Sequence, residues 1–418
     1  MRPLWKLAAS VCLVALAGGY ALLTSAPSDA RPPGTKASFA DSATVSFVRP
    51  GLRIQILSAS ASVAGVVKAR VKFSDPRGLP LDKDGIETPG SIRNGAPGML
   101  IAYVPKGGSK YVNYITRIAT DARTGKTARQ ATSENNGTWT KLAPGEYEYT
   151  FRVVLPSGYD RTATHTVGVF GTRDLTEFDL GIDQADAVFH FAPDGSKLEQ
   201  TPDVVRTGTC QKCHNDMVFN THTRSGRISM EMCVLCHNPQ SFDPNGESLE
   251  MGVMVHRIHM NSSLPSVVAG AKFEYRGKNY AKTIYSADKR ECATCHEAGS
   301  AAKQADFAFH KPTRAACGSC HDNVDFATGV NHVNLPQVSD NQCALCHIPQ
   351  GELDFDASII GAHRIPRQSP SLEGVVFDIL EVVDGSAGKK PTVVFTVKDK
   401  AGKPLTVASM TRVRLTLA

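Results

Sequence analysis

Alternating apolar and polar residues predict a series of short β-strands over the first half of the chain, from residue 43 to about residue 203. The clearest alternation lies at residues 52–57, 66–73 and 147–155. Segments rich in Pro, Gly, Asn and Asp separate the runs and predict turns at residues 75–78, 105–108, 135–137 and 156–158. Strands at this spacing are typical of an antiparallel split β-barrel or sandwich, and a domain of about 160 residues can bury its own core.

The alternation fades over residues 204–368, where repeated prolines predict short helices and loops. Residues 273–280 lie in the longest interval of this region and suit an inserted hairpin. We therefore predict that a mostly irregular, short-helical domain follows the N-terminal β domain at residues 43–203.

A β pattern returns over residues 369–418. Residues 374–380 resemble residues 51–57, and residues 396–405 resemble residues 72–81. This internal repeat predicts the start of a second, incomplete copy of the first β domain. An incomplete domain would leave apolar strand edges unpaired, so we expect the chain to be a fragment of a longer protein.

The N-terminus has the pattern of a secretory signal peptide at residues 1–26, with cleavage after Ala26 or as late as Ala30. A basic start precedes an apolar run over residues 7–23. An uncleaved membrane anchor is the alternative, because this run is near the lower limit for spanning a bilayer. Residues 27–42 are rich in Pro, Ser, Ala and Gly and suit a linker. We expect an exported protein.

The chain has eleven cysteines, and ten of them lie in five Cys-x-x-Cys-His motifs. The motifs are Cys210-Cys213-His214, Cys233-Cys236-His237, Cys292-Cys295-His296, Cys317-Cys320-His321 and Cys343-Cys346-His347. This is the spacing of a c-type haem attachment site, in which two thiols bond to the porphyrin and the adjacent histidine binds the iron. We therefore predict five covalently bound haems, with the motif histidines as proximal ligands.

Other cysteine chemistry accounts less well for these motifs. Tetrahedral zinc in its Cys₄ form uses pairs two at a time, so five pairs would leave one over. Neither zinc, disulfides nor iron–sulfur clusters require a histidine after every second cysteine. The remaining cysteine, Cys12, lies in the apolar leader and lacks the pattern of a lipidated residue.

Distal ligands are sought among the eight histidines outside the motifs. Six of these fall within or just beyond the motif region: His222, His256, His259, His310, His332 and His363. His256 and His259 are three residues apart, so a helix would place them on one face, where they can serve two neighbouring haems. We regard His310 as the most expendable of the six. His165 and His190 lie in β-like sequence, although His190 is also close enough to serve as a spare ligand.

Six distal histidines for five irons predict haems that are closed on both faces. Closed, bis-histidine haems relay electrons and leave no vacant iron site for a small substrate. Methionines in the region, among them Met217, Met230 and Met254, are more plausible as packing residues. The formal charge of +6 is no sign of nucleic-acid binding, since the leader removes two positive charges and five haems add about ten propionates.

The motif region and the domain order resemble the outer-membrane decahaem c-type cytochromes of metal-respiring bacteria, the OmcA/MtrC family. The resemblance is carried by residues 232–239, 254–260, 290–296 and 314–329. It implies a β domain, a pentahaem module and the start of a second β domain, located at the cell surface or outer membrane. It also implies the distal ligands His222, His256, His259, His332 and His363.

For function, the resemblance implies terminal electron transfer in dissimilatory metal reduction. Electrons would arrive from a partner cytochrome or an outer-membrane porin–cytochrome conduit and leave to metal oxides, soluble metals or flavins. We assign no catalytic residue, and the protein would be at most a terminal metal reductase. The alternative is a periplasmic multihaem reductase that acts on a small oxyanion at one open haem. Such an enzyme would need an iron without a distal histidine, or a lysine in place of a motif histidine.

Overall fold

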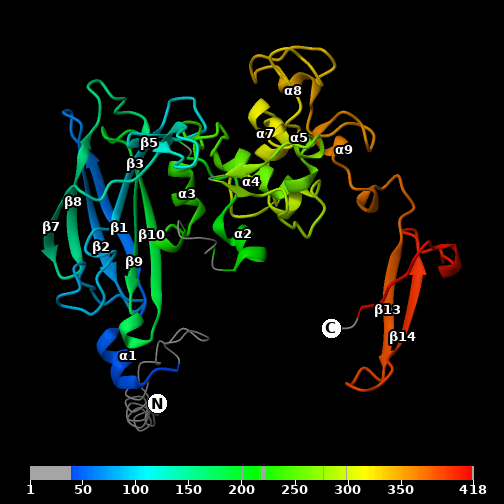
Figure 1. The fold of residues 1–418 in the computed structure, drawn as a ribbon, viewed down its shortest axis with the longest axis horizontal. Helices are drawn as coiled ribbons and strands as arrows, with labels where there is room; N and C mark the ends of the chain where they lie inside the picture. Colours follow the sequence, from blue (N-terminus) through cyan, green and yellow to red (C-terminus); the bar gives the residue numbers. More distant parts are fainter. Residues whose placement is uncertain are drawn as a thin grey trace, which may run out of the picture.

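The computed structural model describes residues 39–199, 201–215, 217, 223–275, 277–297 and 299–416. The predicted signal peptide, most of the predicted linker and the candidate ligand His222 lie outside these residues. Figure 1 shows a β domain, a region of short helices beside it, and a separate hairpin that carries the C-terminal part of the chain.

The first described element is a helix, α1 (Ser42–Val48), where the alternation from residue 43 predicted a strand. Asp41 accounts for the difference, because its side chain accepts a hydrogen bond from the backbone nitrogen of Thr44 at 2.9 Å. Such an N-cap satisfies a backbone donor of the first helical turn. The strand prediction was therefore wrong for this segment, which also overlaps the end of the predicted linker.

The β domain consists of two four-stranded antiparallel sheets and a separate hairpin. The first sheet has the order β1 (Arg53–Ala61), β2 (Val66–Ser74), β8 (Glu146–Val154) and β7 (Thr138–Ala143). The second has the order β10 (Ile182–Phe191), β9 (Thr164–Asp174), β3 (Gly98–Val104) and β4 (Val112–Asn113). The hairpin pairs β5 (Thr116–Thr120) with β6 (Thr127–Ala131), and a short 3-10 helix, η2 (Thr176–Phe178), links β9 to β10.

The core of this domain lies between the two sheets. Val71 and Phe73 of β2 and Tyr149 of β8 are buried from the first sheet, and Ile101 of β3 and Val167 of β9 are buried from the second. Alternate residues of each strand thus point inward, as the sequence alternation predicted. The sheets and the short-helical region that follows confirm the predicted fold class.

The outer face of the second sheet is covered by helix α3 (Met230–Cys236), which carries the second Cys-x-x-Cys-His motif. Met232 and Leu235 of α3 are buried against Leu100 and Phe170 of the sheet. Gly168 of β9 permits this approach, because a Cβ at that position would lie 2.8 Å from the Leu235 side chain. The motif region is therefore packed directly onto the β domain.

The motif region contains short helices and one small hairpin. Its helices are α2 (Thr207–His214), η3 (Thr223–Ser225), α3, α4 (Met251–Met260), η4 (Asn261–Ser263), α5 (Pro265–Val268), η5 (Cys292–Thr294), α6 (Phe307–His310), α7 (Arg314–Gly318), α8 (Cys343–Cys346), α9 (Ile359–Ala362) and η6 (Pro366–Gln368). The hairpin of β11 (Glu274–Tyr275) and β12 (Lys278–Asn279) lies in the segment where the sequence predicted an insertion. Within the described part of the chain, none of the helices is both long and apolar enough to span a bilayer.

The last described strands form a two-stranded unit, β13 (Val376–Val383) with β14 (Thr392–Lys398), followed by η7 (Val407–Ser409). Its hydrogen bonds repeat those of β1 and β2. The nitrogen of Leu405 donates to Val397 as that of Leu81 donates to Phe73, at 2.9 and 3.0 Å. Both hairpins also contain a bulge in the first strand. In Figure 1 the unit stands apart from the β domain, beyond the motif region.

Candidate haem-binding sites

Each motif begins in or beside a short helical segment: α2, α3, η5, α7 and α8 for the five motifs in turn. In four motifs the histidine nitrogen donates to the carbonyl of the first cysteine at 2.8–2.9 Å: His237 to Cys233, His296 to Cys292, His321 to Cys317 and His347 to Cys343. One helical turn therefore brings both thiols and the imidazole to one side. All ten motif thiols are free. Among the described residues, His, Cys, Asp and Glu form no cluster of three that could hold a metal ion.

Four motif histidines each face a histidine from elsewhere in the chain. The ring centroids are 6.1 Å apart for His214 and His259, 6.1 Å for His296 and His256, 6.2 Å for His321 and His363, and 6.1 Å for His347 and His332. An iron bound to two imidazoles through bonds of about 2 Å holds the ring centres about 6 Å apart. The donor set and its spacing therefore fit a six-coordinate haem iron in each pair.

Hydrogen bonds at Nδ1 fix which ring nitrogen is available to an iron. Five rings have a backbone carbonyl at Nδ1: His237 with Leu249 at 2.8 Å, His259 with Val255 at 2.8 Å, His332 with Leu335 at 2.9 Å, His347 with Ala357 at 3.3 Å and His363 with Ile359 at 2.7 Å. A carbonyl only accepts, so Nδ1 carries the proton in each ring. Nε2 is left as the ligating atom, which is the usual arrangement for a metal-bound histidine.

His256 reaches the same tautomer through a side chain. Its Nδ1 lies 3.1 Å from the Ser319 hydroxyl, which donates its own hydrogen to the Ala316 carbonyl. The hydroxyl therefore accepts from Nδ1–H. Burial lowers the pKa of His256 to about 4, with the neighbouring His296 adding to the effect. The ring is neutral at physiological pH, and the neutral form is the one that binds a metal.

Helix α4 supplies two of the facing histidines. His256 and His259 are one turn apart, and they face the third and the first motif respectively. Arg257, between them, instead pairs with Asp322 at 3.3 Å and Glu247 at 3.4 Å. One helical turn thus connects two motif sites, as the sequence predicted for neighbouring haems.

The motifs approach one another in an order that differs from their order along the chain. Lys212 of the first motif pairs with Glu297, directly after the third, at 2.6 Å. Arg314, three residues before the fourth motif, pairs with Asp340, three residues before the fifth, at 2.8 Å.

The remaining neighbours follow from similar contacts. The bond from His256 to Ser319 joins the third site to the fourth motif. The nitrogen of Met230, the first residue of α3, donates to the Thr207 hydroxyl at the start of α2 at 2.9 Å, which joins the second motif to the first. The spatial order is therefore second, first, third, fourth and fifth motif.

The other predicted residues occupy varied positions. His310 lies exposed at the end of α6, and His190 of β10 has Nδ1 2.9 Å from the Thr166 hydroxyl. His165 is fully buried, with Nε2 2.9 Å from the Tyr114 hydroxyl. Met230 and Met232 are buried in the packing of α3. The candidate distal ligand His222 lies outside the described residues.

Apolar side chains around the fifth motif expose more than half of their surface. They are Val330, Val333, Leu335, Val338, Leu345, Leu353 and Phe355. Clustered apolar exposure of this kind marks a surface that something else covers. A porphyrin bonded to Cys343 and Cys346 is apolar and large enough to cover it, so this lining also fits a haem.

Sequence reasoning missed the groups that orient the ligands. Backbone carbonyls such as that of Ile359 carry no sequence signal, because any residue supplies one. Ser319 occupies a variable position of the fourth Cys-x-x-Cys-His motif, and the motif itself assigns that position no role. Arg364 directly follows His363, and Asp354 pairs with it at 2.9 Å. The sequence offered one signal for the pair of Asp354 and Arg364, which is the position of the charged Arg364 next to the candidate ligand His363.

Comparison with known proteins gives concordant results. Residues 202–358 match the family model described as outer membrane cytochrome MtrC/MtrF-like, domains II/IV. A curated relative, the multiheme cytochrome MtrC of Shewanella baltica, is 26% identical over 217 residues, which are 50% of this chain and 29% of the relative.

Two solved structures share the fold. The outer membrane decaheme cytochrome OmcA has a TM-score of 0.59 and 21% identity over 85% of this chain and 54% of its own. MtrC from Shewanella baltica has a TM-score of 0.54 and 18% identity over 85% of this chain and 52% of its own. The chain thus spans about half the length of these solved relatives.

The attachment motifs and the paired histidines define a multihaem c-type cytochrome, which here is joined to a β domain. Over residues 202–358 the chain matches the MtrC/MtrF-like family model, and its fold is similar to those of OmcA and MtrC. The leader predicted export, and the family model that matches residues 202–358 describes an outer membrane cytochrome.

Proposed function

We propose that this chain carries electrons along five covalently attached, bis-histidine haems at the outer surface of the cell. The observation that supports this proposal is the spacing of the four histidine pairs, whose ring centroids lie 6.1–6.2 Å apart. When bound, the haem iron supplies the chemistry by alternating between its ferrous and ferric states. The residues of the chain would attach each haem through the two motif thiols and would bind its iron through two histidines.

The proposed ligands follow the pairs. The proximal ligands are His214, His237, His296, His321 and His347, and the distal ligands are His259, His222, His256, His363 and His332 in the same order. The assignment of His222 to His237 rests on elimination. His310 and His190 are then not ligands.

The proposed domain boundaries follow the same reasoning. A signal peptide at residues 1–26 precedes a linker, a β domain at residues 43–203 and a pentahaem module at residues 204–368. Residues 369–418 would begin a second β domain. The repeated hydrogen-bond pattern of β1–β2 and β13–β14 supports this last assignment.

Electrons would enter or leave at the two ends of the row of haems. The second motif lies against the β domain, and the fifth lies among exposed apolar side chains on α8 and its loops. The names of the relatives describe outer membrane and multihaem cytochromes. We infer that a partner cytochrome or a porin–cytochrome conduit would exchange electrons with this chain. Metal oxides, soluble metals or flavins would then be the acceptors.

Three measurements on the purified holoprotein test the relay. Intact mass should give five haems per chain, and spectra should be low-spin in both oxidation states. Carbon monoxide should not bind the ferrous protein, because every iron already has two histidines. A high-spin ferric haem, or one carbon monoxide bound per chain, would instead favour an open-haem reductase.

A further inference from the structure

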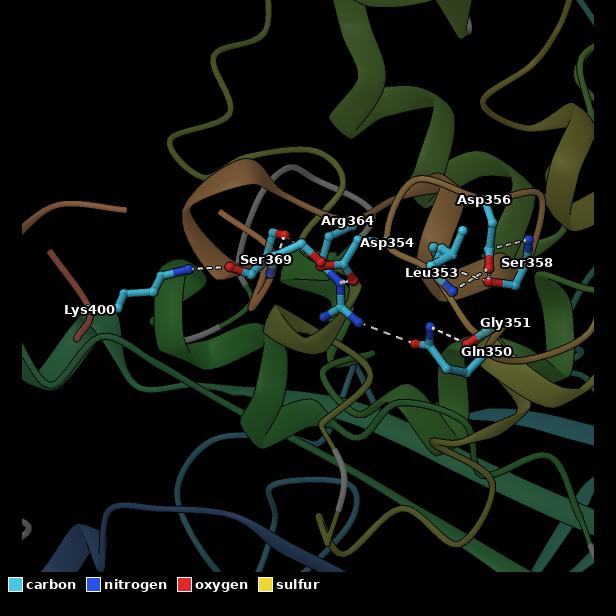
Figure 2. Close-up of polar contacts among 11 residues, drawn as sticks. Gln350, Gly351, Leu353, Asp354, Asp356, Ser358, Arg364, Ser369 and Lys400 are labelled. Carbon is cyan, nitrogen blue, oxygen red and sulfur yellow. Dashed lines mark hydrogen bonds and ion pairs between the residues drawn. The ribbon is translucent and has the colours of Figure 1, made fainter. Parts of the chain in front are cut away.

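The segment between His347 and Ser369 is held by a connected set of polar contacts, drawn in Figure 2. It leads from the histidine of the fifth motif to His363, which faces the fourth motif. The end of the segment is bonded back to its beginning. The Ile359 nitrogen donates to the Ile348 carbonyl at 2.9 Å, and the Ile360 nitrogen donates to the Pro349 carbonyl at 3.0 Å. One segment therefore carries ligand positions of two neighbouring sites.

Asp354 lies at the centre of these contacts. Its side chain is 6% exposed and accepts from Arg364 Nε at 2.9 Å. It also accepts from the hydroxyls of Ser369 at 2.5 Å and Ser371 at 3.4 Å. Arg364 makes a further bond to Gln350 at 3.2 Å. A carboxylate with a charged partner and hydroxyl donors in so shielded a place holds its neighbours in one geometry.

His363 depends on this arrangement for its position. It follows α9, a helix of four residues, and four residues are too few to form a helix without tertiary support. Ser358 caps that turn by accepting from Gly361 at 3.0 Å, and Asp356 in turn accepts from the Ser358 nitrogen at 2.9 Å. On the other side of His363, Arg364 is fixed by Asp354. The ring is thus held from both directions along the chain.

The same carboxylate connects to the second β unit. Lys400, two residues after β14, donates through its ammonium group to the Ser369 carbonyl. The backbone nitrogen of Lys400 also donates to the backbone carbonyl of Glu373 at 2.9 Å. Figure 2 shows the resulting path from Lys400 through Ser369 and Asp354 to Arg364.

We propose that Asp354 is a positioning residue for the iron ligand His363, and that it mechanically couples the β13–β14 unit to the haem of the fourth motif. The proposal rests on the proposed function in one respect, that His363 is an iron ligand. Groups that hold a ligand in place tune the metal as well as its affinity. A displacement of β13–β14 would reach the imidazole through Ser369, Asp354 and Arg364 and would change the electronic structure of one haem in five.

The test uses the full-length holoprotein and the electron paramagnetic resonance spectrum of its ferric haems. His363→Ala first identifies the signal of the fourth haem, because that signal alone should become high-spin. Asp354→Asn, which keeps the size but loses the charge, should then move this low-spin signal and leave the other four in place. Asp378→Asn is the control, since Asp378 pairs with Lys398 at 2.6 Å on β13–β14 and both side chains are about 40% exposed.

Lys400→Ala tests the coupling to the second β unit, with Lys398→Ala as its matched control. Lys400→Ala should move the same signal in the same direction, and Lys398→Ala should not. If Asp354→Asn shifts the signal but Lys400→Ala does not, the coupling is wrong. If neither shifts it, the positioning role is wrong as well.

One result tests the relay separately from this proposal, and a replacement variant keeps the proposal testable. A wild-type protein with an open haem, or with fewer than five haems, would contradict the relay before any variant is compared. Should Asp354→Asn fail to give a five-haem protein, Ser369→Ala replaces it, because it removes one donor from Asp354 and leaves Arg364 in place. An unmoved signal in Ser369→Ala and in Lys400→Ala would overturn the positioning role.

Discussion

At the scale of single residues, the six rings with a defined Nδ1 partner present Nε2 to the space where an iron would lie. This makes the ligands of α4 separable by mutation. His256 faces His296, and His259 faces His214, although one helical turn joins them. Each should therefore serve a different haem.

We predict that His256→Ala and His259→Ala each open one haem, and that the double variant opens two. The thioether bonds to the motif cysteines keep each haem attached, so the haem count should stay at five. Carbon monoxide titration of the ferrous protein measures the number of open irons, with one equivalent for each single variant. A double variant that binds only one equivalent would contradict the assignment. His310→Ala, at an exposed position, is the control and should bind none.

Arg227 provides a second residue-scale prediction. It lies 3.9 Å over the ring of Phe170, and its charge acts on the thiols of Cys233 and Cys236. A nearby buried cation disfavours the more positive ferric iron and so raises the potential of the second haem. Arg227→Gln should lower that potential by an amount on the order of tens of millivolts. Spectroelectrochemical titration measures it.

The matched control for Arg227 is Arg123→Gln. Arg123 is exposed and pairs with Asp121 at 3.0 Å, so solvent screens its charge. Its loss should leave all five potentials in place. A potential that rises in Arg227→Gln would show that the cation is not the dominant charge at this haem.

At the scale of elements, the packing of α3 on the second sheet depends on one missing side chain. A Cβ at Gly168 would lie 2.8 Å from Leu235 and 3.1 Å from Met232. Gly168→Val should therefore overpack this contact and lower the free energy of unfolding by about 1–3 kcal/mol. Chemical denaturation of the holoprotein, followed by tryptophan fluorescence, measures the loss. Gly208→Ala on α2, where a Cβ meets nothing within 4 Å, should not destabilise the protein.

The elements also show where sequence reasoning works. Alternation located β1, β2 and β8, where burial alternates along much of each strand, and the long interval between the second and third motifs located the inserted hairpin of β11 and β12. Alternation also predicted a strand where α1 forms. Apolar and polar residues alternate there too, but the cap at Asp41 decides the conformation. The attachment motifs were readable because covalent chemistry fixes their local spacing. The partner of each motif histidine could not be read from the sequence, because residues such as His214 and His259 meet only through the tertiary fold.

At the scale of the whole molecule, the spatial order of the motifs makes the second haem terminal and the first haem internal. If the haems followed the order of their motifs along the chain, the first haem would be terminal and the second internal. We predict that removing the second haem, with Cys233→Ala and Cys236→Ala, leaves the other four in fast exchange. Removing the first haem, with Cys210→Ala and Cys213→Ala, should isolate the second and give a slow phase in stopped-flow reduction. Equal kinetics in the two variants would contradict this order.

The hydrogen bonds at Nδ1 bear on how such a protein evolves. Five of the six rings donate to main-chain carbonyls, which every amino acid supplies. Substitutions around these ligands therefore leave the orienting group intact, provided that the local backbone path is kept. Relatives with the same fold share only 18–21% of their residues with this chain. Redox centres that are oriented by the backbone tolerate such sequence drift, and selection can then act on surfaces and partners while the haem row persists.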